Sequence, residues 1–144
     1  MATSTFHNEI SQRLSERDVR YTRGRHTVVT ALARSEGPRT ASELHAELRL
    51  PLSSIYRSLA VLEEAGVLEP HFGQRGLTRY ELAEWLGGHH HHLVCVECGA
   101  VDDIELPETY ESKVSELVEG IGSLAGFTPL SHALEIEGRC TRCA

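Results

Sequence analysis

Hydrophobic residues recur at the spacing of an α-helix in the early part of the chain. Val28, Val29 and Leu32 would lie on one face of such a helix. Thr22 stands just before this stretch and has the side chain of a helix N-cap, while residues 35–38, Ser-Glu-Gly-Pro, carry the signals that end a helix. The pattern predicts a helix whose inner face belongs to a hydrophobic core.

Two further helices follow at the same spacing. Thr40 and Glu43 stand three residues apart in the order of a capping box, which opens the first of them. Ser53 or Ser54 is expected to cap the second, and Gly66 is expected to end it. The residues expected on the buried faces are Ala41, Leu44 and Leu48 in the first, and Ile55, Leu59 and Leu62 in the second.

The pattern then changes from helical to strand-like. Residues 67–72 and 78–82 flank a Gly-Gln-Arg-Gly turn at 73–76, which indicates a β-hairpin. A helix over about residues 6–17 is also expected to precede the other helices. Three helices followed by a hairpin predict a winged helix-turn-helix, a fold that reads DNA.

The hydrophobic pattern breaks over residues 83–88, where two consecutive glycines indicate a linker. The sequence therefore predicts an α+β fold with a winged-helix DNA-binding domain over 1–82, a hinge over 83–88 and a small C-terminal α/β domain over 89–144. Because a unit of this size buries little surface by itself, a metal and a dimer contact would fit, which would make the last unit a dimerisation domain. The elements expected in the last domain are strands over 93–95, 101–105 and 133–137 and a helix over about 108–120.

The charge divides between the two halves of the chain. The formal charge is −7, yet eleven arginines stand against ten acidic residues up to Leu82, whereas three basic stand against eleven acidic residues from Ala83 onward. Five of the arginines lie between Arg13 and Arg25. Because phosphate contacts hold nucleic acid largely through Lys and Arg, the first half suits DNA. A solvated helix face is the alternative reading of these arginines.

Two features of composition bear on location. No run of about eighteen apolar residues is present, and residues 1–10 lack the basic-then-apolar order of a signal peptide. We therefore expect a cytoplasmic protein without a membrane partner.

The four cysteines form two Cys-x-x-Cys pairs, and paired thiolates of this spacing can complete a tetrahedral zinc site. The long interval between the pairs would tie the C-terminal tail to the first strand of its domain. Disulfides and a redox-active pair are the alternatives, and a cytosolic location and the lack of an αβ context disfavour them. The predicted ligands of structural Zn²⁺ are Cys95, Cys98, Cys140 and Cys143.

Four consecutive histidines precede the first cysteine pair. Alternate side chains of a strand point to opposite faces, so His89 and His91 would face one way and His90 and His92 the other. One short segment could thus supply two imidazoles to each of two metal sites, although a solvated histidine tract is the plain alternative. Candidate partners are Glu69 and Glu81 on the hairpin, Glu111 on the helix and His132 before the last strand.

Several separated motifs, taken in order, resemble the ferric uptake regulator family over nearly the whole chain. They are Arg20-Tyr-Thr-x-x-Arg25, Thr40-Ala-x-Glu-Leu44, Ile55-Tyr-Arg-x-Leu59, Glu64-Ala-Gly66, Arg79-Tyr-Glu-Leu82, His90-His-His-Leu-Val-Cys-x-x-Cys-Gly99 and Leu134-Glu-Ile-x-Gly-x-Cys-x-x-Cys143.

The resemblance implies a homodimeric repressor that binds palindromic operator DNA when a regulatory divalent metal is loaded. It places the recognition helix at residues 53–65, with Tyr56 and Arg57 in the major groove and Arg20 near the minor groove. The expected DNA-contacting residues are Arg20, Ser54, Tyr56 and Arg57.

The resemblance also assigns two regulatory metal sites. The hinge site would use Glu69, Glu81, His90 and His92, and the second would use His89, His91, Glu111 and His132, with Glu108 as the alternative to Glu111. Iron- and peroxide-sensing members commonly have a histidine before the Thr-Ala segment, where this chain has Gly37-Pro38-Arg39. Zinc-sensing members often have a cysteine on the wing, which is missing too. The regulatory metal is therefore left open between Zn²⁺ and Fe²⁺, with Mn²⁺ as a further candidate.

Two other classes of function compete with a repressor. A metalloenzyme could hold a catalytic zinc on His and Glu, but His-Glu-x-x-His, deaminase, nucleophile-elbow and phosphate-loop motifs are all lacking. A zinc storage or delivery protein would not need a winged helix. We therefore predict a protein that is not an enzyme and has no small-molecule substrate.

Overall fold

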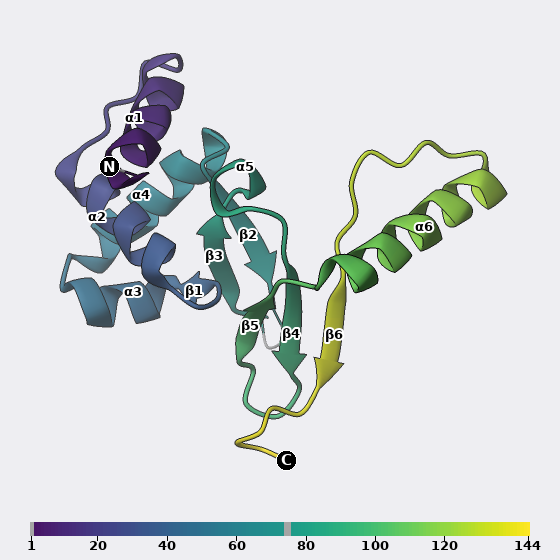
Figure 1. Cartoon of the computed structure of the whole chain (residues 1–144). Coiled ribbons are helices and arrows are strands. Elements are labelled where there is room, and N and C mark those ends of the chain that lie inside the picture. The colour runs from purple at the N-terminus through teal and green to yellow at the C-terminus, as the bar shows by residue number, and fades with distance from the viewer. Residues whose placement is uncertain (1, 74–75) are drawn as a thin grey trace. The chain divides into compact units, whose positions relative to one another are not determined.

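A computed structural model describes residues 2–73 and 76–144 (Figure 1). The chain divides into two compact units, Met1–Gly88 and His89–Ala144. Helices dominate the first unit and each unit has its own three-stranded sheet, so the predicted α+β fold class is confirmed. None of the helices in the described residues is both long and apolar enough to cross a membrane.

Four helices of two turns or more build most of the first unit: α1 (Ala2–Ser15), α2 (Arg23–Arg34), α3 (Ala41–Leu48) and α4 (Leu52–Glu64). Thr22 caps α2 by accepting a hydrogen bond from the backbone N–H of Arg25, and Thr40 and Glu43 form the predicted capping box of α3. These caps satisfy N–H groups that the first turn of a helix leaves without partners.

The start of α4 differs from the prediction. The helix begins at Leu52, its N-cap is Pro51, and no side chain caps it, so the expected cap at Ser53 or Ser54 is wrong. Pro51 has φ −55°, which proline fixes, and ψ 136°, so it lies outside the helix and α4 starts at the next residue. Ser53 and Ser54 consequently lie inside the first turn, where both are exposed.

One hydrophobic core holds these helices together, and the predicted stripes supply it. Ile55, Leu59 and Leu62 of α4 are almost fully buried, as are Val28 and Val29 of α2. Ala41 and Leu44 are buried as predicted, while Leu48 is partly buried against the core. α2 and α4 are therefore held in place by packing on one another.

The predicted hairpin forms the wing. β2 (Leu68–Phe72) and β3 (Thr78–Leu82) pair antiparallel, and a strand not predicted from the sequence, β1 (Arg39–Thr40), joins β3 to give the order β1-β3-β2. Gln74 and Arg75 of the predicted turn lie outside the described residues.

Residues 83–88 are not the irregular linker that their composition indicates. A one-turn helix, α5 (Glu84–Gly87), occupies most of the segment. Ala83 is buried, and its backbone N–H donates to the carbonyl of Val67 at 2.9 Å. Tertiary contacts therefore order a segment that the local sequence predicts to be irregular. Gly88, which follows this segment, has a φ of +81°.

The second unit consists of β4 (His91–Cys95), β5 (Val101–Ile104), α6 (Glu108–Ala125) and β6 (Glu135–Gly138). The strand order is β5-β4-β6, with β4 antiparallel to β5 and parallel to β6. α6 extends beyond the predicted end at residue 120 and stops at Gly126, which has the left-handed φ of +64° typical of a helix C-terminus.

Candidate metal centres and nucleic-acid interface

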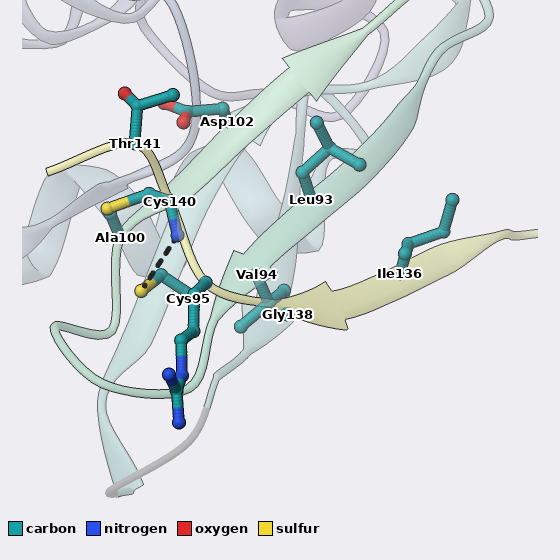
Figure 2. Close-up of a pocket in the computed structure, with 10 residues that line it drawn as sticks. Leu93, Val94, Cys95, Ala100, Asp102, Ile136, Gly138, Cys140 and Thr141 are labelled. Atoms are coloured by element: carbon teal, nitrogen blue, oxygen red, sulfur yellow. Dashed lines mark hydrogen bonds between the residues drawn. The ribbon is translucent and has the colours of Figure 1, made fainter. Parts of the chain in front are cut away.

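The four cysteines meet at one end of the second sheet. Cys95 ends β4 and Cys140 follows β6, and the parallel pairing of these strands sets Cys95 opposite Gly138. The positive φ of Gly99 (+75°) lets the chain turn back after Cys98, so that both sulfurs of the pair face the same point. The four Sγ atoms lie within 4.8 Å of one another, and Figure 2 shows Cys95 and Cys140 side by side.

The geometry of this cluster fits a tetrahedral zinc. Cys98 Sγ and Cys140 Sγ are 3.8 Å apart. Zn–S bonds of about 2.3 Å would put the sulfurs of a tetrahedron at roughly that separation. A disulfide needs about 2.0 Å, and all four cysteines are free. The structure thus favours a metal over the disulfide alternative.

Hydrogen bonds shift the pKa values of two of these thiols in opposite directions. The backbone N–H of Cys98, followed by that of Cys140 (3.4 Å from Cys95 Sγ), lowers the pKa of Cys95 to about 6. A hydrogen bond with Cys140 instead raises the pKa of Cys143 to about 12. Thiolate is the form that binds metal, so the first sulfur of the cluster is ready to bind at neutral pH.

A second cluster joins the histidines of odd number with α6. His91 begins β4 and is almost fully buried (1% exposed), and His89 precedes it on the same face. Glu111 reaches them from the first turn of α6, and His132 from the segment before β6. The distances to the carboxylate of Glu111 are 3.0 Å from His89 Nε2, 2.8 Å from His91 Nε2 and 3.1 Å from His132 Nε2.

This arrangement answers which glutamate of α6 belongs to the cluster. Glu111 lies among the imidazoles, whereas Glu108 accepts a long hydrogen bond from Ser112 at 3.5 Å. The hydrogen bond from His91 is the main cause that lowers the pKa of Glu111, so the carboxylate is held in its charged form. Three imidazole nitrogens and one carboxylate oxygen make a suitable donor set for a first-row divalent metal.

Glu111→Gln is expected to weaken binding of one equivalent of divalent metal by on the order of 10- to 100-fold, because it removes a charged donor from the cluster. A competition titration of Zn²⁺ against a chromophoric chelator would measure the affinity. Glu108→Gln, one turn away on the same helix, is the matched control and should bind metal normally. A Glu108→Gln protein that loses the site while Glu111→Gln keeps it would contradict the assignment.

The histidines of even number face the other side of the strand. His90 Nε2 and His92 Nε2 lie 3.6 Å and 3.4 Å from Asp103 Oδ1, and the two rings meet edge to face with centroids 5.0 Å apart. Asp103 was not among the residues predicted from the sequence. The antiparallel register sets it opposite His92, and counting back from the turn of the first cysteine pair would have found it.

The two glutamates predicted for the hinge site lie on the wing. Glu81 of β3 is directly opposite Glu69 of β2 in the antiparallel ladder, and Glu69 is exposed. Like charges placed opposite one another are unfavourable unless a cation or a proton compensates them. Their participation in a metal site stays a prediction.

The residues predicted to contact DNA are all at the surface of the first unit. Ser54, Tyr56 and Arg57 are exposed on α4. Tyr56 is 52% exposed while its neighbour Ile55 is fully buried, so Tyr56 is not a core residue. Arg20 is also exposed, and the guanidinium of Arg25 donates to its carbonyl at 2.6 Å, which fixes the backbone before α2.

Comparison with known proteins decides the family. The model of the Ferric uptake regulator family matches residues 16–137. The chain belongs to this family. The ferric uptake regulation protein of Legionella pneumophila is 31% identical over 141 residues, which cover 94% of this chain and 98% of that protein. The crystal structure of the Vibrio cholerae ferric uptake regulator superposes with a TM-score of 0.69 at 25% identity, over 90% of this chain and 98% of that one.

A third relative, the ferric uptake regulation protein of Neisseria meningitidis, is 35% identical over 96 residues, which are 67% of this chain. The match spans 62% of the length of that relative. Members of the ferric uptake regulator family are metal-responsive transcription regulators and not enzymes, so the predictions of the family and of a non-enzymatic class are confirmed.

Proposed function

We propose that this protein is a homodimeric transcriptional repressor that binds palindromic operator DNA when its regulatory sites hold a divalent metal. The observation that carries the proposal is the histidine tract, residues 89–92. Its alternate side chains meet two separate acidic partners, Glu111 on one face and Asp103 on the other. This segment directly follows the winged-helix unit in the sequence. The arrangement therefore supports the proposal that metal binding controls DNA binding.

The first unit would read the operator. Arg57 can bind guanine through two hydrogen bonds, and the ring of Tyr56 can pack on a thymine methyl group. Ser54 would donate to a phosphate from the start of α4, and Arg20 would approach the minor groove. The exposure of these four side chains supports this division of roles, as does the concentration of arginine in residues 13–25.

The second unit would form the dimer. Its buried apolar side chains are few, with Val94, Cys95 and Val101 as the main ones, and a unit of this size needs a metal or a partner for stability. α6 leads away from the sheet in Figure 1, and several of its apolar side chains are exposed. The large exposed apolar residues of this unit are Leu93, Val96, Tyr110, Leu117, Ile121, Leu124, Phe127, Leu130 and Ile136. A second copy of the chain would cover such a surface.

The regulatory step would be a linkage between metal binding and the orientation of the first unit. We infer that Glu81, with Glu69 beside it, completes the site of His90, His92 and Asp103. A bound divalent cation supplies the positive charge that lets these carboxylates approach one another. Residues before and after Gly88 would then be ligands of one metal ion. Binding of that ion would therefore select one orientation of the two winged-helix units of the dimer. Coupling of this kind contributes about 1–3 kcal/mol, or about 5- to 150-fold in DNA affinity.

The donor sets bear on which metals are bound. Four thiolates favour Zn²⁺ at the cysteine cluster, whereas imidazole and carboxylate accept Zn²⁺, Fe²⁺ or Mn²⁺. The relatives reported above are named for ferric uptake, which supports Fe²⁺ as the regulatory metal. We place the protein in the cytoplasm, where operator DNA and reduced thiols are both found.

An electrophoretic mobility shift on a palindromic A·T-rich operator tests the proposal. The protein, with its cysteine cluster kept zinc-loaded, is titrated in parallel with Zn²⁺, Fe²⁺ and Mn²⁺. The effective metal is expected to raise operator affinity about 5- to 150-fold. Operator binding that no metal changes would refute a metal-dependent repressor.

His90→Ala and Asp103→Asn should remove most of this enhancement while leaving the structural zinc in place, because both residues belong to the even-numbered histidine cluster. Asp102→Asn is the matched control, since Asp102 is the neighbouring residue of β5 and lies outside that cluster. It should respond to metal like the native protein. Full metal dependence in both cluster variants would show that the regulatory site lies elsewhere.

A further inference from the structure

Trp85, the single tryptophan of the chain, joins three separate segments of the first unit. Its indole Nε1–H donates to the carbonyl of Gly66 at 2.8 Å. Gly66 directly follows the C-cap of α4. From another side the guanidinium of Arg13, in α1, lies 4.6 Å from the centre of the indole ring, within the range of a cation–π interaction. We call Arg13, Gly66 and Trp85 the tryptophan clamp.

The backbone of Gly66 is suited to this contact. Its φ is +74°, a backbone conformation that residues other than glycine adopt only at a cost in free energy. This conformation turns the chain from α4 toward Val67. A Cβ atom at this position would approach the Nη1 of Arg13 to 3.5 Å. The end of the recognition helix, the α1 arginine and the indole therefore occupy one small volume.

Two backbone contacts reinforce the clamp. The N–H of Ala83 donates to Val67 just after Gly66, and the N–H of Gly87 closes α5 on the carbonyl of Ala83 at 3.0 Å. Leu86 packs against the core. An isolated helix of one turn is unstable in water, so α5 depends on these anchors. The chain thus leaves the first unit from a turn that is fixed to the end of α4.

We propose that Trp85 is a positioning residue that fixes the exit direction of the chain relative to the recognition helix α4. With the clamp closed, rotation of the chain between the units is confined to Gly88 and the residues after it. An orientation imposed at the histidine tract then becomes an orientation of α4. With the clamp open, residues 83–87 would add further rotatable bonds, and the same metal would restrict α4 less. This inference rests on the proposed function.

A purely structural role for Trp85 is the competing interpretation. The side chain is 43% exposed, so its burial contributes less to stability than that of a core residue. The two roles differ in what they predict. A structural residue alters the free energy of unfolding alone, whereas a positioning residue alters the ratio of operator affinities with and without regulatory metal.

The test measures that ratio by mobility shift at fixed salt for native protein, Trp85→Leu and Trp85→Phe, each with its structural zinc retained. Trp85→Leu is expected to lower the ratio by about 2- to 30-fold, the range of substitutions along a coupling network. Trp85→Phe keeps a ring for Arg13 but loses the donor, and should lie between the two. Metal stoichiometry and dimer mass should be unchanged.

Arg13→Gln tests the second contact of the clamp, with Arg17→Gln as the matched control. Arg17 follows the end of α1 and is exposed. Arg13→Gln should lower the affinity ratio and Arg17→Gln should not. A native ratio in Trp85→Leu and Arg13→Gln would overturn the inference, even if their melting temperatures fell. A native protein without metal dependence would instead refute the proposed function.

Fluorescence of the single tryptophan supplies a readout that does not depend on DNA. If the clamp stays closed in both states, the emission maximum and acrylamide quenching of Trp85 should be the same before and after Zn²⁺ is added. Arg13→Gln should increase quenching, because one face of the indole is then uncovered. A large change in the native protein on metal addition would show that the clamp opens, which would overturn the inference.

Discussion

Cys95→Ser is expected to unfold the second unit and abolish the proposed dimer. Structural zinc contributes apparent binding free energies of about 10–16 kcal/mol in small zinc domains, whereas a whole domain is stable by about 5–15 kcal/mol. The second unit buries few apolar side chains that could compensate. Cys95 itself is buried (4% exposed), and backbone hydrogen bonds lower its pKa to about 6, so serine replaces a ligand that is ready to bind as thiolate.

Three measurements on the purified variant check this expectation: zinc content, the thermal transition by circular dichroism and the mass in solution by light scattering. Thr141→Ser changes a residue between the last two cysteines without removing a ligand, and should behave like the native protein in all three. Stripping zinc from native protein with a strong chelator should reproduce the Cys95→Ser result. A variant that keeps native melting and remains a dimer without zinc would contradict a structural role.

Much of the first unit could be predicted because its local signals and its packing agree. Thr40 and Glu43 cap a helix in sequence and in structure, and Ile55 and Leu59 follow the spacing of a buried helix face. The exceptions occur where tertiary contacts outweigh local preference. The composition of residues 83–88 predicts a linker, yet burial of Ala83 and the hydrogen bond from Trp85 order most of these residues.

The candidate metal clusters were predictable to the extent that the period of a strand determines them. Alternation along β4 separates His89 and His91 from His90 and His92 without knowledge of any partner. Asp103 was missed because its place depends on the register between β4 and β5. The choice between Glu108 and Glu111 depends on how α6 meets the sheet, which spacing alone does not give.

The length of α6 was underestimated for a related reason. Glycine costs about 1 kcal/mol relative to alanine inside a helix, and the predicted end coincides with Gly120. The helix continues to Ala125, and Gly126 ends it. The extension lengthens a stripe of apolar residues that the structure leaves exposed, with Leu117, Ile121 and Leu124 on one side of the helix. The function proposed for this stripe is contact with a second copy of the chain.

Leu117→Glu is expected to dissociate the proposed dimer. Leu117 is 63% exposed in the single chain and begins the apolar stripe that Ile121 and Leu124 continue along α6. Covering a leucine stabilises an interface by about 1.5–3 kcal/mol, and an unpaired carboxylate placed there adds a desolvation penalty. A twofold axis repeats each change in the partner copy. We expect the dissociation constant to rise by at least about 100-fold, which corresponds to about 2.7 kcal/mol.

Analytical ultracentrifugation over a range of protein concentrations would measure this constant. Ser115→Glu introduces the same charge on the same helix, roughly 150° around its axis from the centre of the stripe, and should remain dimeric. Leu117→Glu should also lose tight binding to a palindromic operator while retaining weak binding to a half-site, because a monomer has only one winged-helix unit to bind DNA. A Leu117→Glu protein that stays dimeric at nanomolar concentration would place the interface on another surface, and the exposed stripe of α6 would then require a different partner.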